Sequence, residues 1–164
     1  MAGDVKIGMI GAGYAAHVRA CAVKEFDSKR LLMSGVYDKN PGHSSEFSKE
    51  FGVKSFSSLD GILDSSDINT VSVAVPNKYH YEIVKQALER GKNAICEYPL
   101  VLDRYKKGEE LVRLSEKNNL LLHVGHTMNY DADYQLVESH RKDLAPLSCI
   151  IRTDAAMMSP SLVS

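Results

Sequence analysis

The chain has 164 residues, of which 44% are hydrophobic and 25% charged, and its 20 lysines and arginines nearly balance 21 aspartates and glutamates. A formal net charge of −1 argues against binding to nucleic acid or an anionic membrane through bulk charge, because such binding needs a clustered basic face. No run approaches the roughly 18 apolar residues of a membrane span, and the N-terminus lacks the pattern of a secretory signal peptide. The cytoplasm is therefore the expected location.

The cysteine pattern suggests neither disulfides nor a metal site. Cys21, Cys96 and Cys149 make an odd count, and no two of them form a CxxC pair. We expect three reduced, buried thiols. His123 and His126 straddle the end of an expected strand, with no carboxylate beside them on one helix face, so no bound metal is expected.

Taken in chain order, short apolar runs alternate with stretches of helical period, which is typical of a doubly wound parallel α/β sheet. The expected strands are residues 5–10, 31–37, 53–56, 70–75, 93–96 and 120–124. The expected helices cover residues 14 to about 26, 44–51, a segment that begins at 57–60, regions around 83–88 and 111–115, and about 133–142. The segment Asn40-Pro41-Gly42 is expected to be a turn.

The first expected strand runs into a glycine-rich segment, GAGYAA, at residues 11–16. This is a GxGxxA form of the dinucleotide fingerprint: Gly11 permits a tight turn, Gly13 lets the backbone approach a pyrophosphate, and Ala16 lets helix and strand pack closely. The helix that begins with Tyr14 and Ala15 would present its N–H groups to an anion. The segment therefore predicts a dinucleotide site, and the alternative is a tight turn with no ligand.

A carboxylate, Asp38, ends the second expected strand at the fingerprint's usual spacing of about 20 residues. An acidic group there accepts hydrogen bonds from the adenosine ribose and repels a 2′-phosphate, so it predicts NAD rather than NADP. Lys39 comes next and offers a cation to a 2′-phosphate, which keeps NADP possible. The alternative is a strand-terminal Asp that merely begins a turn.

Ligands of open α/β sheets bind beyond the carboxyl ends of the strands, so the segments after the fourth and fifth expected strands are the next candidates. They read PNKYHYE at residues 76–82 and EYPL at residues 97–100. Together with GAGYAA, the strand-terminal Asp38 and the AL-x-x-GK run at residues 87–92, the segments VAVPNKYHYE and CEYPL resemble the glucose–fructose oxidoreductase, inositol dehydrogenase and MocA-like (Gfo/Idh/MocA) family. The resemblance covers about residues 4–125.

This resemblance implies an NAD(P)-dependent oxidoreductase with an N-terminal Rossmann domain. Its members transfer a hydride between the nicotinamide and a sugar, cyclitol or related polyol, and a small-molecule substrate is the expected partner. Pro76, Asn77 and His80 become candidate cofactor contacts, with Asn77 and His80 near the nicotinamide, and Glu97 and Pro99 shape its pocket. The alternatives are a surface position for His80 and, for Glu97, a carboxylate satisfied by backbone N–H groups.

One departure from the family concerns proton transfer. The usual motif after the fifth strand is Glu-Lys-Pro, whereas this chain has Glu97-Tyr98-Pro99. Tyr98, with Glu97, is the candidate catalytic group, although a phenol with a reference pKa near about 10 needs stabilisation to act as a base. Biliverdin reductases carry a similar Glu-Tyr-Pro segment, so a bilin reductase is an alternative. A nucleotide-binding or regulatory module without turnover is another.

The second departure lies in residues 126–164. Residues 1–125 predict a complete Rossmann domain, and the remainder resembles the start of a substrate domain that is truncated or absent. Residues 147–153 look like a strand with an unpaired apolar edge. They predict that the chain associates with itself as a homo-oligomer, through this segment.

Overall fold

A computed structural model describes residues 4–26, 28–102 and 105–140 of the chain. The chain divides into two compact units, Met1–His126 and Thr127–Ser164. The first contains a six-stranded sheet in which every strand pairing is parallel, with the order β3-β2-β1-β4-β5-β6. The strands are β1 (Val5–Ile10), β2 (Leu31–Tyr37), β3 (Lys54–Ser55), β4 (Thr70–Val73), β5 (Asn93–Glu97) and β6 (Leu122–Gly125). The predicted doubly wound α/β fold is confirmed.

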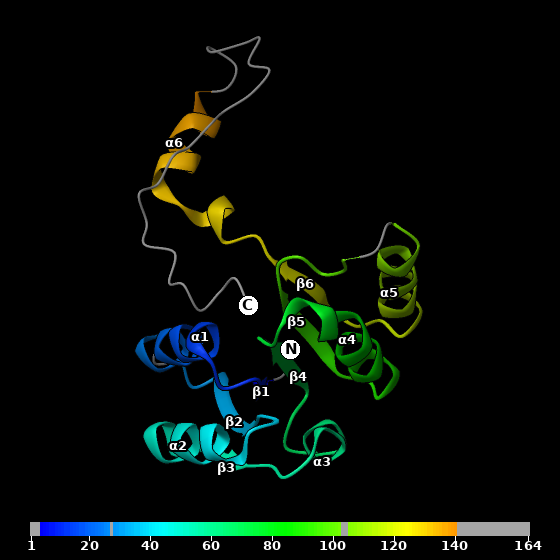
Figure 1. Cartoon of the computed structure of the whole chain (residues 1–164). Coiled ribbons are helices and arrows are strands. Elements are labelled where there is room, and N and C mark those ends of the chain that lie inside the picture. Colours follow the sequence, from blue (N-terminus) through cyan, green and yellow to red (C-terminus); the bar gives the residue numbers. More distant parts are fainter. Residues whose placement is uncertain (1–3, 27, 103–104, 141–164) are drawn as a thin grey trace. The chain divides into compact units, whose positions relative to one another are not determined.

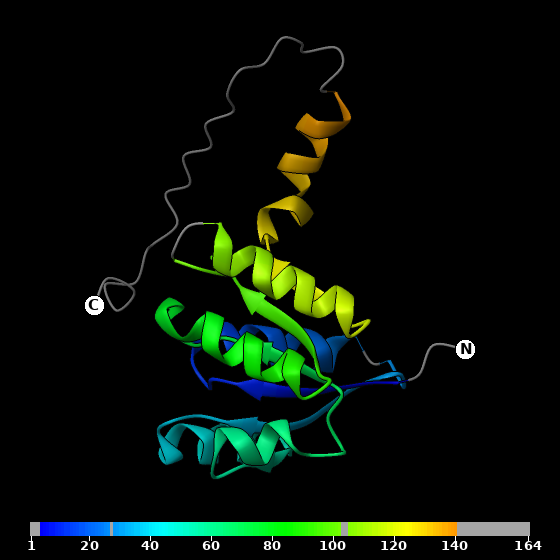
Figure 2. The same cartoon turned by 90° about the vertical axis from the view of Figure 1, so that its right-hand side faces the viewer.

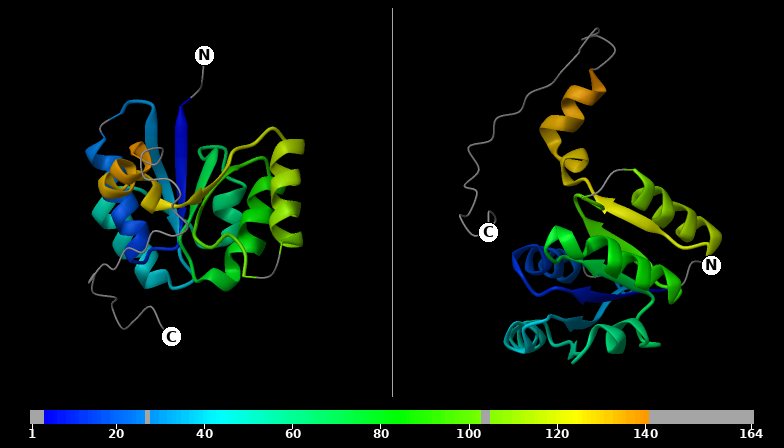
Figure 3. Two further views of the ribbon diagram at one scale, coloured as in Figure 1. Left: turned by 90° about the horizontal axis from the view of Figure 1, so that it is seen from above. Right: turned by 45° about the vertical axis from the view of Figure 1, so that its right-hand side comes forward.

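Helices cover both faces of this sheet (Figure 1 and the left view of Figure 3). One face carries α1 (Tyr14–Glu25) and α2 (Pro41–Phe51), whose Ala16, Ala20 and Phe47 pack on the sheet. The other carries α3 (Leu59–Leu63), α4 (His80–Glu89) and α5 (Lys106–Lys117) over a second core; α4 and α5 lie in front of the sheet in Figure 2. The strands between two covered faces are apolar because neither side meets water, and all four residues of β4 are buried.

The predicted turn at Asn40-Pro41-Gly42 is wrong, because these residues begin α2. The side chain of Asn40 caps the helix by accepting a hydrogen bond from the N–H of Gly42 at 2.9 Å, and Pro41 occupies the first turn. Asn and Pro favour helix starts as well as turns, so the dipeptide alone does not separate the two. Gly52, with φ of 67°, then ends α2.

The prediction of buried thiols holds for Cys96 and is wrong for Cys21. Cys96 lies on β5 between the sheet and its helices and is fully buried. Cys21 is exposed because it lies on α1 away from the buried Ala16 and Ala20. Cys149 lies outside the described residues.

The second unit begins with a short 3-10 helix, η2 (Thr127–Tyr130), and continues with α6 (Ala132–Ser139). The last predicted helix, at about residues 133–142, corresponds to α6. The strand predicted at residues 147–153 lies outside the described residues. In the described part of the chain, no helix has the length and apolar character needed to cross a membrane.

Candidate dinucleotide-binding site

The carboxyl ends of four neighbouring strands place a row of residues at one level of the sheet. Ile10 of β1 pairs with Tyr37 of β2 and with Val73 of β4, and Val73 pairs with Cys96 of β5. The next residue along each strand continues this level, in the spatial order Asp38, Gly11, Ala74, Glu97. Neighbouring strands lie about 4.8 Å apart, so the row extends over about 14 Å. It crosses the point between β1 and β4 where the strand order reverses, which is where doubly wound sheets bind ligands.

The two glycines of the loop after β1 have different surroundings. Gly11 has φ of 97°, and a Cβ added there would collide with the carbonyl oxygen of Ala74. Gly13 is the N-cap of α1, and an added Cβ would meet no atom within 4 Å. In the described part of the chain, no side chain of the N-cap residue forms a capping hydrogen bond to this helix, since that residue is Gly13. Gly11 is therefore required by the turn itself, whereas Gly13 leaves open space in front of the helix N-terminus, where a phosphate can approach.

Asp38 is fixed by the loop that it faces. Its Oδ2 accepts a hydrogen bond from the N–H of Ala12 at 2.8 Å, and its Oδ1 accepts one from the N–H of Asn40, also at 2.8 Å. Nδ1 of His43 lies 3.8 Å from the same Oδ1. Each carboxylate oxygen has a second lone pair, so Asp38 can still accept hydrogen bonds from two ligand hydroxyls.

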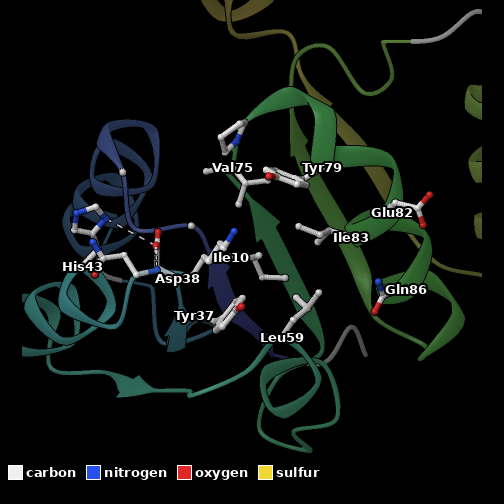
Figure 4. Close-up of a pocket in the computed structure, with 16 residues that line it drawn as sticks. Ile10, Tyr37, Asp38, His43, Leu59, Val75, Tyr79, Glu82, Ile83 and Gln86 are labelled. Carbon is white, nitrogen blue, oxygen red and sulfur yellow. Dashed lines mark hydrogen bonds and ion pairs between the residues drawn. The ribbon is translucent and has the colours of Figure 1, made fainter. Parts of the chain in front are cut away.

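A pocket of about 770 Å³ opens between these strand ends and α4, a volume within the usual range for ligand sites of about 300–1,000 Å³. Figure 4 shows Asp38 and His43 on one side and Tyr79, Ile83 and Gln86 on the other. Its apolar lining includes Ile10, Tyr37, Leu59, Val75 and Ile83. Apolar walls with a carboxylate at the rim suit a planar base attached to a ribose.

Five of the predicted cofactor contacts line this pocket: Gly11, Gly13, Asp38, Lys39 and Pro76. The lining also includes Tyr79 and Glu82, which lie in the candidate segment 76–82 but were not named individually, and Asn40, His43 and Gln86, which the sequence did not single out. Glu82, Ile83 and Gln86 recur at helical spacing on α4, a signal that could have located this wall.

The other predicted contacts lie outside the pocket lining. Ala16 is fully buried beneath the loop, Ala15 is half-buried, and Tyr14 is 84% exposed. Asn77 is exposed at the start of η1 (Asn77–Tyr79).

His80 is completely buried, so the alternative of a surface position is wrong. Its Nε2 lies 2.8 Å from the carbonyl oxygen of Val75, and its Nδ1 lies 2.8 Å from that of Pro99. The ring thus joins the segment after β4 to the segment after β5. Both ring nitrogens face protein atoms, and the ring is not among the residues that line the pocket.

Glu97 lies beyond the pocket, at the end of β5. Its Oε1 forms an ion pair with Nη2 of Arg19 at 2.7 Å, so a guanidinium faces the carboxylate where backbone N–H groups were the alternative. Arg19 was not predicted as a site residue. Tyr98 is 64% exposed, and its ring centroid lies 5.0 Å from that of His126, just after β6.

Two further kinds of chemistry find little support in the described residues. Burial raises the pKa of the Cys96 thiol to about 12, which keeps it protonated and poorly nucleophilic, in line with the predicted packing role. Within the described ranges, no three His, Cys, Asp or Glu side chains gather where they could hold a metal ion.

Comparison with known proteins agrees with this geometry. The sequence model described as "Oxidoreductase family, NAD-binding Rossmann fold" (GFO_IDH_MocA) matches residues 5–126. The chain belongs to the Gfo/Idh/MocA oxidoreductase family. The family resemblance expected from the motifs is confirmed, and the six-stranded unit is an NAD(P)-binding Rossmann domain.

Among the relatives, an uncharacterized oxidoreductase of Streptococcus pneumoniae is 35% identical over 126 residues, which are 77% of this chain and 33% of the relative. Glucose-6-phosphate 3-dehydrogenase of Bacillus subtilis is 40% identical over 97 residues, or 59% of this chain and 27% of the relative. Among solved structures, biliverdin reductase of Synechocystis in complex with biliverdin and NADP+ has a TM-score of 0.76 at 29% identity. That match covers 84% of this chain and 43% of the reductase. The matched region spans a third or less of these two curated relatives.

Proposed function

We propose that this chain is the cofactor-binding part of an NAD(P)-dependent oxidoreductase that acts on a sugar, cyclitol or related polyol. The observation that carries the proposal is the row formed by Asp38, Gly11, Ala74 and Glu97, with open space at Gly13. The similarity to glucose-6-phosphate 3-dehydrogenase supports a sugar-like substrate.

The residues present fit a dinucleotide. The pocket beside Ile83 would hold the adenine, and Asp38 would accept hydrogen bonds from the ribose hydroxyls. The backbone at Gly13 and the first turn of α1 would receive the pyrophosphate. The nicotinamide half would then extend along the row toward Glu97. When bound, the nicotinamide supplies hydride acceptance and donation.

Asp38 favours NAD, because its carboxylate repels a 2′-phosphate. Lys39 and His43 bring cationic or protonatable groups to the same side of the pocket, so we expect the preference for NAD to be moderate.

Tyr98 is the candidate proton donor and acceptor at the substrate hydroxyl, in the position of the family's usual lysine. Its exposure leaves the phenol accessible to a substrate, and the ring of His126 lies beside it. Glu97 is the second candidate, although its ion pair with Arg19 suits binding better than proton transfer.

Calorimetric titration of the chain with NADH and NADPH tests the cofactor proposal. We expect NADH to bind more tightly than NADPH, and Asp38→Ala to remove most of the difference. Lys39→Ala in the same assay should instead weaken NADPH more than NADH. Equal affinity of the wild-type chain for the two would refute the NAD preference, and no binding of either would refute cofactor binding.

A turnover screen over polyols and biliverdin tests the activity. A bilin reductase is the second candidate, favoured by the Glu97-Tyr98-Pro99 segment and by the 29% identity with biliverdin reductase. Oxidation of a polyol supports the leading proposal, and reduction of biliverdin supports the second. Tight NADH binding with no turnover in any oligomeric state favours a nucleotide-binding module.

The expected homo-oligomer, formed through residues 147–153, remains a proposal, as does the cytoplasmic location. Light scattering over a range of protein concentrations tests the first. A clean monomer at high concentration would count against self-association.

A further inference from the structure

A single arginine connects the helix of the glycine loop with the two strands beside it. Arg19 lies on α1, and its side chain is 21% exposed. Its Nη1 donates a hydrogen bond to Oγ of Ser72, in the middle of β4, at 3.0 Å. Its Nη2 lies 2.7 Å from Oε1 of Glu97, at the end of β5. Because the guanidinium is planar and rigid, two acceptors fixed on two strands define its orientation.

The backbone of β6 leaves little room for this arrangement to change. Glu97 pairs in register with Gly125 of β6. A Cβ added at Gly125 would lie 2.7 Å from Nη2 of Arg19 and 3.4 Å from Oε2 of Glu97. The guanidinium and the carboxylate therefore fill the space over Gly125, and a larger residue there would displace them.

The two carboxylate oxygens of Glu97 have different surroundings. Oε1 faces Arg19, which compensates its charge, whereas Oε2 retains its capacity to accept a hydrogen bond. Glu97 is level with Ala74, which lines the pocket, and lies two strands away from Gly11. That distance is about 10 Å from the loop that would hold the pyrophosphate, on the side opposite Asp38.

We propose that Arg19 is a positioning residue that holds Glu97 as the hydrogen-bond acceptor for the nicotinamide half of the dinucleotide. The group recognised is an N–H or O–H donor of that half, either the carboxamide or the adjacent ribose hydroxyls. The inference rests on the proposed cofactor binding, in which the family resemblance already implies Glu97 near the nicotinamide, and adds to it the residue that fixes Glu97 there. It also assigns Glu97 a binding role in place of proton transfer.

Binding of NADH and ADP to the 164-residue chain tests the proposal, because ADP lacks both the nicotinamide and the ribose attached to it. Affinities are measured by calorimetry, and NADH fluorescence reports the surroundings of the reduced ring. Arg19→Met removes both donors and keeps most of the aliphatic stem. We expect it to weaken NADH about tenfold and to leave ADP within about twofold, as for the loss of one charge-assisted hydrogen bond.

Two further variants separate positioning from stability. Arg19→Lys keeps the charge and should recover part of the NADH affinity. In a Glu97→Ala background, Arg19→Met should cause no additional loss, because the residue through which it acts is gone. The control is Arg113→Met: Arg113 pairs with Glu109 of the same helix, α5, at 3.7 Å, and neither residue lines the pocket. It should change neither ligand's affinity.

Equal weakening of NADH and ADP by both Arg19 variants, accompanied by a lower melting temperature, would show a purely structural role and overturn the inference. An unchanged ratio of the two affinities in Arg19→Met would also overturn it. Wild-type chain that binds ADP as tightly as NADH would refute recognition of the nicotinamide half while leaving nucleotide binding intact. Failure to bind either ligand would refute the proposed function itself, and this inference with it.

Discussion

The turn at Gly11 gives a prediction whose size can be worked out from the structure. The methyl group introduced by Gly11→Ala lowers the free energy of unfolding in two ways. The backbone at φ of 97° is a conformation that Ala adopts at a cost of about 1–3 kcal/mol. The methyl would also collide with the carbonyl oxygen of Ala74 and lie 2.8 Å from its carbonyl carbon. Ala74 cannot easily retreat, because its own N–H donates to the carbonyl of Ile10 at 2.8 Å.

The backbone shift that removes this collision should lower the free energy of unfolding by about 1–2 kcal/mol more, as at other overpacked sites. The free energy of unfolding should then fall by about 2–5 kcal/mol. A domain of this size loses about 3 °C of melting temperature per kcal/mol, so Gly11→Ala should melt roughly 6–15 °C below the wild type. Thermal unfolding followed by circular dichroism measures this difference.

Gly13→Ala is the matched control, two residues away in the same loop. Its Cβ meets no atom within 4 Å, and its backbone φ of −85° suits any residue. Replacing glycine by alanine at an N-cap should cost no more than about 1 kcal/mol, whereas NADH affinity should fall at least about tenfold because the methyl occupies the pyrophosphate approach. If Gly11→Ala melted within about 2 °C of Gly13→Ala, the distinction between a turn glycine and a ligand glycine would be refuted.

Three further predictions concern buried groups. His80→Ala should lower the free energy of unfolding by about 2–4 kcal/mol, measured in urea, because it leaves a cavity and removes the ring N–H donor that faces the carbonyls of Val75 and Pro99; a loss below about 0.5 kcal/mol would contradict the buried bridge. Cys21 should react with a maleimide in the native chain and Cys96 only after unfolding, and peptide mass spectrometry showing equal native labelling would contradict their placement. Burial raises the pKa of the Cys96 thiol from 9.0 to about 12, so the thiol of the unfolded chain loses its proton at a lower pH than that of the folded chain. The contribution of this thiol to the free energy of unfolding is therefore complete below the pKa of the unfolded chain and is lost as the pH rises toward the pKa of the folded chain. Urea midpoints from pH 8 to 10 should therefore decline more steeply in the wild type than in Cys96→Ala, and parallel declines would exclude this cause.

The sheet could be predicted from the sequence because its strands, most clearly the fully buried β4, stand out as apolar runs between turn residues. The glycine loop and Asp38 were also predictable, since their roles follow from local backbone requirements at a fixed spacing. Arg19 was not, because a basic residue in an alanine-rich helix has no local signature of its ion pair. Its partner Glu97 is far away in sequence and comes within reach only through the register of β1, β4 and β5.

The same limit explains the residues whose surroundings differ from expectation. Cys21 is exposed although a cysteine is usually an inner residue, because the helix phase of α1 turns it outward. His80 is buried although it is polar, because the backbone carbonyls of Val75 and Pro99 both face its ring in the interior. Asn40 and Pro41 begin a helix because the chain after β2 returns along the sheet. In each case tertiary structure decides between options that the local sequence leaves open.

The buried His80 has a consequence for how chemistry can vary on this fold. It holds the carbonyl of Pro99 from beneath, while the neighbouring Tyr98 points outward and is 64% exposed. The loop is thus anchored at Pro99 by a ring that does not line the pocket. A lysine in place of Tyr98 would leave this anchor intact and would present an ammonium where this chain presents a phenol.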